Sequence, residues 1–170
     1  STFVVSVGGA VSVVKIEDNI TSDMVWETGK IYVLGGRITV VAGVELSIQP
    51  GVIVKGEAGS GANATALVIA RGATIEAEGT ADQPIIFTSI ADEIMPGMVA
   101  SPNLDADIDG LWGGLLVLGK APSSFAGNVS EVQIEGIPPS DTNGLHGGDD
   151  PEDYSGKLKF ISIRHGGANI

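Results

Sequence analysis

The sequence has no cysteine, few basic residues and few aromatic residues. Without cysteine the chain can form neither a disulfide framework nor a thiolate metal site. Its 9 Lys and Arg residues against 21 Asp and Glu residues give a formal net charge of −12. Because a basic stripe is missing, neither nucleic acid nor an anionic membrane surface is an expected partner. No apolar run approaches the roughly 18 residues that a membrane-spanning helix needs.

Glycine and aliphatic residues are what the chain has in abundance. The 25 glycines show no three-residue period, which excludes a collagen helix, and they suit a protein with many tight turns. Hydrophobic residues make up 43 % of the 170 residues. That share disfavours intrinsic disorder, and the length is enough for one sizeable core.

Apolar residues alternate along the chain, as in Ile38 and Val40 or in Ile69, Ala73, Ile75 and Ala77. A period of two is typical of half-buried strands, and no helical stripe is present. Four similar segments recur: Val44–Gly56, Ala66–Gly79, Leu111–Gly119 and Leu158–Gly167. Aligned on Leu46, Leu67, Leu116 and Phe160, they are offset by 21, 49 and 44 residues, which indicates a repeat with insertions at about 90–110 and 121–156. The pattern predicts stacked coils of a β-solenoid, with a β-sandwich as the alternative.

The segments IQPGVIVKG (Ile48–Gly56), ARGATIEAEGTADQPIIFTS (Ala70–Ser89), GLWGGLLVLGKA (Gly110–Ala121) and YSGKLKFISIRHGG (Tyr154–Gly167) resemble a family of secreted bacterial proteins, frequent in Bacteroidetes. The resemblance implies an all-β, right-handed parallel β-helix of pectate-lyase-like architecture, secreted or on the cell surface. This fold hosts adhesins, lyases and inert stalks alike, so it implies no activity. We expect the β-helix over residues 26–170 and an extra N-terminal β segment, a cap or donor strands, over residues 1–25.

The family usually continues past the equivalent of HGGANI (His165–Ile170) with further coils and a cap, whereas this sequence stops at Ile170. An uncapped coil exposes strand edges and an apolar end. Either the sequence is a fragment, or something covers that end. A second copy would do so with its N-terminal strands, Phe3–Val7 and Ala10–Val14, and such head-to-tail contacts would build a filament. The residues expected to make the assembly contact are Phe3, Val5, Val7, Val11, Val13, Ile161, Ile163 and Ile170.

Two acidic groups lie in the insertions. Asp105, Asp107 and Asp109 alternate and precede Gly110, as at the start of a calcium-binding loop. The twelfth-position Glu of an EF-hand is replaced by Leu116, so the pattern predicts a calcium loop of a β-protein, with a solvated acidic loop as the alternative. Asp149 and Asp150 would join this site if the two insertions lay side by side. An exposed charged loop is the simpler interpretation of the second group.

No residue pattern predicts catalysis. The basic residues near repeated strands, Arg71, Lys120, Lys159 and Arg164, have no carboxylate at a spacing that would fix it beside them. His146 and His165 are far apart, and His165 is interpreted as a turn residue that bonds to the backbone. Polysaccharide lysis and glycoside hydrolysis are therefore not expected.

Trp26 and Trp112 are either glycan contacts or parts of the core. Asn19, Asn63 and Asn128 occupy N-x-S/T triplets, which mark glycosylated loops in some organisms and ordinary turns in others. The sequence thus predicts a non-catalytic structural β-solenoid, self-assembling and stabilised by calcium. The alternative is a carbohydrate-binding or lyase-like module of a larger exported protein.

Overall fold

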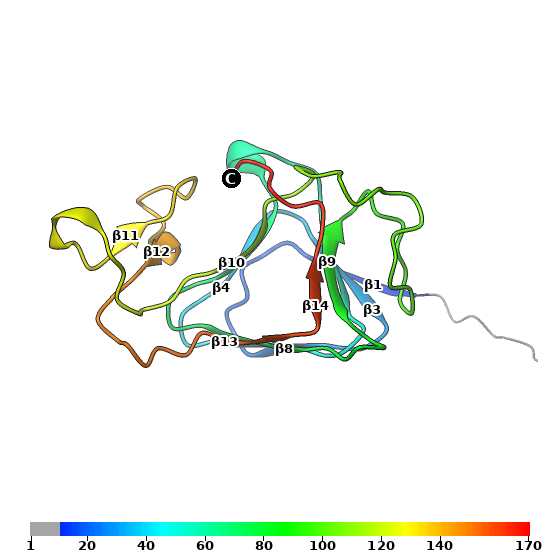
Figure 1. Cartoon of the computed structure of the whole chain (residues 1–170), viewed down its shortest axis with the longest axis horizontal. Coiled ribbons are helices and arrows are strands. Elements are labelled where there is room, and N and C mark those ends of the chain that lie inside the picture. Colours follow the sequence, from blue (N-terminus) through cyan, green and yellow to red (C-terminus); the bar gives the residue numbers. More distant parts are fainter. Residues whose placement is uncertain (1–10) are drawn as a thin grey trace, which may run out of the picture.

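The computed structural model describes residues 11–170, and these residues form a parallel β-helix with three faces (Figure 1). Sheet A contains, in spatial order, β1 (Ser12–Ile16), β3 (Lys30–Leu34), β6 (Ile53–Gly56), β9 (Ile85–Ser89) and β14 (Ile161–Ile163). Sheet B contains β4 (Arg37–Val40), β7 (Ala66–Ile69) and β10 (Gly114–Val117). Sheet C contains β2 (Met24–Trp26), β5 (Glu45–Ile48), β8 (Thr74–Glu78) and β13 (Gly156–Lys159). The predicted fold class is confirmed.

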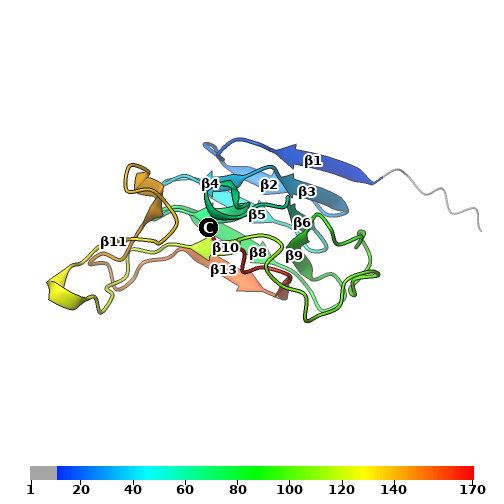
Figure 2. The ribbon, with the colours of Figure 1, turned by 90° about the horizontal axis from the view of Figure 1, so that it is seen from above.

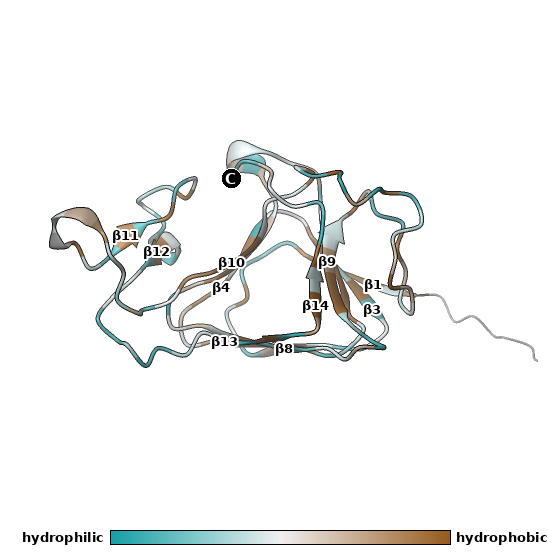
Figure 3. Cartoon of the chain, in the orientation of Figure 1, coloured by the Kyte–Doolittle hydropathy of each residue, from teal (hydrophilic) through white to brown (hydrophobic). Residues whose placement is uncertain are grey.

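Each coil passes through sheet C, then sheet A, then sheet B, and successive coils stack on one another (Figure 2). All strand pairs in the three sheets are parallel, so like positions lie above one another. In sheet C the inward-facing side chains of Trp26, Ile48 and Ala77 stack in successive strands, and all three are buried. We call such a column of stacked inward-facing side chains an inward ladder. The strands that wall the interior are correspondingly hydrophobic (Figure 3). Alternation of apolar residues in the sequence therefore reports the inward face of each coil.

The alignment of the four similar segments was wrong in register. Leu46 lies in sheet C and Leu67 in sheet B, so the 21-residue offset relates two different faces. The true stacking partner of Leu46 in the next coil is Ile75, and Leu116 pairs with Val68. Each coil contains three short apolar strands that resemble one another. Similarity between two segments therefore does not show whether they lie on different faces of the β-helix or on the same face in successive coils.

The N-terminal boundary of the β-helix is also earlier than predicted. Strand β1 pairs in parallel with β3, and Ile20 forms a parallel bridge to Val40. Coiling thus begins no later than Ser12 rather than at Trp26.

The two predicted insertions lie at opposite ends of the long axis of the molecule (Figures 1 and 2). The first joins β9 to β10 over residues 90–113, and its buried Ile94 packs on the outer face of sheet A against Ile31, Ile53 and Ile86. The second joins β10 to β13 over residues 118–155 and packs Ile137 on the outer face of sheet B. It includes the antiparallel pair β11 (Val132–Gln133) and β12 (Leu145–His146), and three 3-10 turns complete the structure: η1 (Gly61–Asn63), η2 (Ala126–Asn128) and η3 (Thr142–Gly144).

A buried carboxylate fastens the first insertion to sheet A. Asp92 is fully buried, and its carboxylate accepts hydrogen bonds from the Thr88 hydroxyl (2.8 Å), the Ser101 hydroxyl (2.8 Å) and the Ile94 amide (3.0 Å). The ammonium group of Lys55 donates to the backbone oxygen of Asp92 at 2.6 Å. Burial by itself raises the pKa of Asp92, but these hydrogen bonds and the Lys55 charge together hold that pKa below its ordinary value.

Replacing Asp92 with Asn should loosen this attachment. One carboxylate oxygen becomes an amide NH2 group, which donates and cannot accept, so at least one of the three buried donors loses its acceptor. We expect a loss of about 1–3 kcal/mol in the free energy of unfolding, measured by urea denaturation. Asp107→Asn, an exposed carboxylate of the same insertion, is the matched control and should change stability by less than about 0.5 kcal/mol. Equal effects of the two substitutions would contradict the assignment.

The stabilisation by Asp92 should depend on pH. Because the folded protein binds this proton less readily than the unfolded chain, the contribution is fully present above the ordinary carboxyl pKa of about 4. It is lost as the pH falls through the lowered pKa of the folded state. The difference in unfolding free energy between the wild type and Asp92→Asn should therefore shrink on acidification below about pH 4. A difference that grows on acidification would contradict the lowered pKa.

Candidate functional site

The end of the β-helix formed by β10, β13 and β14 exposes residues that belong to the inward ladders. Val117, Leu158 and Ile163 are 40 %, 43 % and 48 % exposed. Their partners in the preceding coil, Ile69, Ala77 and Phe87, are all completely buried members of the core. We call this surface the end face. An inward-facing side chain that lacks a coil on one side keeps about half of its surface in water.

The opposite end, formed by β1 and β2, has the same property to a smaller degree. Val14, Ile16 and Met24 pair with the core residues Tyr32, Leu34 and Leu46, and all three are only partly buried. The core below them begins with the stacked rings of Trp26 and Tyr32, whose centroids are 4.7 Å apart. Both ends of the described coils therefore present apolar ladder residues in the geometry of a parallel sheet.

The predicted assembly residues fall into four groups. Phe3, Val5 and Val7 lie outside the described residues. Ile161 and Ile163 are on β14, at the end face, and Ile170 lies beside Gly113 and Gly136. Val11 and Val13 form the fourth group.

Val11 and Val13 contradict the prediction that this region supplies a donor strand. Val11 packs on the outer face of sheet A, beside Ile31 and Val33. Val13 is on β1 and 60 % exposed, and β1 is already hydrogen-bonded within its own chain. A strand that completes sheet A of its own molecule is not available to leave it for a neighbour.

A cleft of about 550 Å³ lies between the first insertion and the end of β14. It brings together Asp105, Asp109, Arg164 and His165, although the first two are far from the last two in the sequence. The Arg164 guanidinium donates to the Val99 backbone oxygen and the Ser162 hydroxyl. It therefore ties the insertion to β14, which leaves it poorly placed to act as a base.

His165 is a turn residue that bonds to the backbone, as predicted. Its φ is +55°, it is 7 % exposed, and its Nδ1 lies 2.6 Å from the Ile108 backbone oxygen. The Nε2 atom is buried without a hydrogen-bond partner.

The predicted joint metal site of the two acidic loops is wrong. Asp149 and Asp150 belong to the second insertion, whereas Asp105, Asp107 and Asp109 belong to the first, and the two insertions extend from opposite sides of the β-helix (Figure 1). All five side chains are exposed. Within residues 11–170, no three or more Asp, Glu or His side chains are grouped to hold a metal ion. The insertions follow the consecutive strands β9 and β10, which lie in different sheets, so they cover different faces of the β-helix and are not brought together.

The prediction that the tryptophans contact a glycan is also wrong, because both are fully buried. Trp112 fills the corner between sheets A and B, and its indole nitrogen donates to the Arg164 backbone oxygen at 2.8 Å. Gly56 makes room for it, since a Cβ at that position would lie 2.8 Å from the Trp112 ring. The core interpretation of both residues is confirmed.

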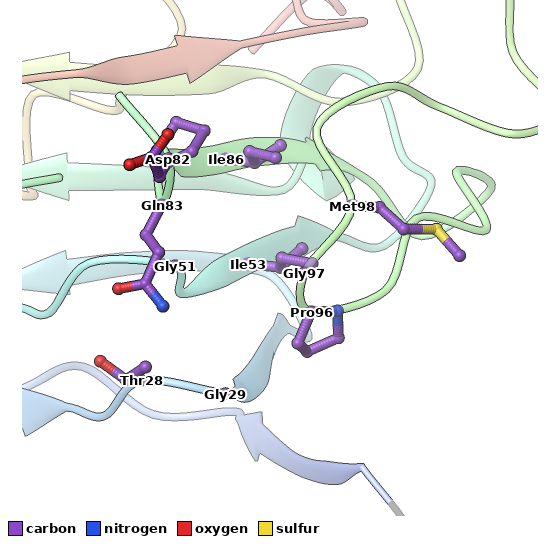
Figure 4. A pocket seen from close by; sticks show the side chains of 11 residues that line it. Thr28, Gly29, Gly51, Ile53, Asp82, Gln83, Ile86, Pro96, Gly97 and Met98 are labelled. Carbon is purple, nitrogen blue, oxygen red and sulfur yellow. The ribbon is translucent and has the colours of Figure 1, made fainter. Parts of the chain in front are cut away.

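A second, smaller cavity lies where the first insertion approaches the corner between sheets C and A (Figure 4). Thr28 and Gln83 from the corner and Pro96 and Met98 from the insertion line it. The cavity holds about 70 Å³, room for a few water molecules but not for a sugar ring.

Arg71 supports the second insertion from the turn before β8. Its guanidinium pairs with the Glu131 carboxylate at 2.7 Å and donates to the Gly147 backbone oxygen at 2.7 Å. The sequence indicated only that Arg71 marks a turn.

Neither the curated proteins nor the solved structures that were compared contain a match to this chain. No helix within residues 11–170 is long and apolar enough to cross a membrane. The model of the family of pectate-lyase-like β-helix domains matches residues 18–170, which is the whole described β-helix apart from its first strand. The coils, their three parallel sheets and this match agree, and the chain belongs to the family of pectate-lyase-like β-helix domains.

Proposed function

We propose that the chain is a non-catalytic structural β-solenoid of the cell surface or extracellular space, and that its end face docks on a second copy. The observation that carries the proposal is the exposure of Val117, Leu158 and Ile163 at ladder positions that are fully buried one coil earlier. Full burial of such a side chain is favourable by about 1.5–3 kcal/mol. Covering the exposed half of each would gain roughly 1 kcal/mol per side chain.

The two ends fit each other in direction and chemistry. Parallel strands continue a parallel sheet only if the next coil arrives in the same orientation, which a head-to-tail copy provides. The end with β1 and β2 offers the partly buried Val14, Ile16 and Met24 to the end face. A head-to-tail contact uses different surfaces on the two partners, so it repeats without closing and builds a filament.

Carbohydrate binding is the second candidate, and the cleft between the first insertion and β14 favours it. The cleft combines apolar walls, such as Val99 and Leu104, with the carboxylates of Asp105 and Asp109. Those carboxylates and the net charge of −12 disfavour an acidic glycan, so a neutral one is the better candidate. Monomers that bind a neutral oligosaccharide would favour this function over stacking.

Charged substitutions on the end face should prevent assembly. For Leu158→Asp and Ile163→Asp we expect the oligomers of the wild type to be replaced by monomers in sedimentation velocity, because stacking would bury an unpaired carboxylate. Val129→Asp is the matched control: Val129 is 49 % exposed but lies in the second insertion. It should assemble like the wild type, and circular dichroism should be unchanged in all three. A wild type that stays monomeric at high concentration would overturn the proposal.

Calcium is proposed as a stabiliser of the first insertion because the carboxylates of Asp105, Asp107 and Asp109 alternate as in a calcium loop; they are exposed and not grouped in the structure, so binding requires them to converge on the ion. Calcium should raise the melting temperature by a few degrees, and a chelator should reverse the shift. Replacing all three residues with Asn should abolish the shift. Asp149→Asn with Asp150→Asn, in the other acidic loop, is the control and should retain it. Equal melting curves with calcium and with chelator would contradict the proposal.

A further inference from the structure

Two exposed aromatic side chains lie on either side of β13. Tyr154 precedes this strand and Phe160 follows it, and their side chains are 59 % and 50 % exposed. By contrast, Trp26, Trp112 and Phe87 are completely buried. A single exposed apolar residue is ordinary, but two aromatic rings at the two ends of one four-residue strand indicate an interaction surface.

Phe160 has a backbone conformation that disfavours its own side chain. Its φ is +48°, in the left-handed region where glycine is the usual residue and a bulky side chain is strained. The corner between β13 and β14 uses only the backbone of this residue, whose carbonyl accepts a hydrogen bond from the Ile85 amide at 3.0 Å. Half of the side chain is in water, and its ring centre lies 5.6 Å from the ammonium group of the exposed Lys159. A contact outside the molecule therefore explains this ring better than the core does.

Polar groups of both charges lie between the two rings on the outer face of sheet C. The Tyr154 hydroxyl donates to the Glu76 carboxylate of β8 at 2.7 Å, so the tyrosine ring lies across this face toward β8. The Lys157 ammonium group pairs with the Glu78 carboxylate at 2.9 Å. The surface thus offers hydrogen-bond donors and acceptors side by side. We call the outer face of β13 and β8, with these four residues and Phe160, the sheet C strip.

The sheet C strip is open to a large ligand. Within residues 11–170 the two insertions pack on sheets A and B, and sheet C forms the side of the β-helix that neither covers (Figure 1). From Tyr154 to Phe160 the extended chain spans roughly 20 Å, because a strand rises about 3.3 Å per residue. The strip is on the outer face, whereas the end face uses the inward Leu158 of the same strand. Stacking of copies would therefore leave the strip free.

We propose that the sheet C strip binds a neutral polysaccharide chain, which lies along β13 and packs sugar rings on Tyr154 and Phe160. The C–H faces of sugars pack on aromatic rings, and their hydroxyls both donate and accept hydrogen bonds. The net charge of −12 disfavours an acidic polysaccharide. A chain that reaches both rings gains from two contacts at once, which suits an open strip. This site is separate from the cleft beside β14, and it does not depend on head-to-tail stacking.

Affinity gel electrophoresis tests the site, with hydroxyethylcellulose, xyloglucan and galactomannan as neutral probes and polygalacturonate as the acidic one. At least one neutral polysaccharide should retard the wild type. Tyr154→Ala and Phe160→Leu should each weaken that binding roughly threefold to tenfold, because each removes one ring contact. Val129→Ala, an exposed apolar residue of the second insertion, is the control and should bind like the wild type. Retardation by polygalacturonate alone, or by none of the four, would overturn the proposal.

Phe160→Gly separates a binding role from a structural one. Glycine relieves the left-handed strain, so the melting temperature should stay the same or rise while binding weakens as in Phe160→Leu. A lower melting temperature with unchanged binding would assign the ring to the fold and overturn the inference. Tyr154→Ala should leave the melting temperature unchanged, because its side chain is mostly in water. If Phe160→Gly loses both stability and binding, the binding of Tyr154→Ala decides: wild-type binding by this variant would overturn the inference.

Discussion

The whole structure depends on the stacking of like side chains along the axis of the β-helix. A single coil cannot bury its inward residues, because each side chain is covered by the coils on either side of it. The ladder through Tyr32, Val54 and Phe87 shows this: each ring or aliphatic group is fully or almost fully buried between its neighbours. The ladder's last member, Ile163, is half exposed. Stability in this fold is therefore a property of neighbouring coils, and the ends are its weakest points.

The two insertions show how outer faces are protected by the same principle. Ile94 covers the outer face of sheet A and Ile137 that of sheet B, each with apolar neighbours on the strands below. Within residues 11–170 neither insertion covers sheet C, and its outer face instead carries paired charges such as Glu78 and Lys157, 2.9 Å apart. Asp92 and Lys55 add a buried polar attachment to the first insertion. The insertions therefore stabilise the β-helix by covering the outer faces of two of its three sheets.

Much of the fold was predictable from the sequence, because alternation and glycine-bounded strands report coils directly. The register was not, since Leu46 and Leu67 stand in strands of similar composition on different faces. The role of Asp92 was missed for a related reason: its partner Lys55 is 37 residues away in the sequence, and only the fold brings the two together. The tryptophans illustrate an ambiguity of residue type, because a ring that can stack on a sugar packs equally well in a core.

The resemblance led us to expect an uncapped end that includes Ile161 and Ile163, but Val117 and Leu158 were not predicted to be part of it, since they look like any other strand residues in the sequence. The strand register distinguishes the residues of the end face: the partners of Leu158 and Ile163 at the same ladder positions, Ala77 and Phe87, are fully buried, whereas Leu158 and Ile163 are exposed. A solenoid buries its inward residues by stacking coils, so an end coil is stabilised when another coil covers it. Because every coil has the same direction, a partner that supplies it must also be directional. A second copy of the same chain meets that condition without any new chemistry, and this is why the ends, rather than the acidic loops, carry the proposed function.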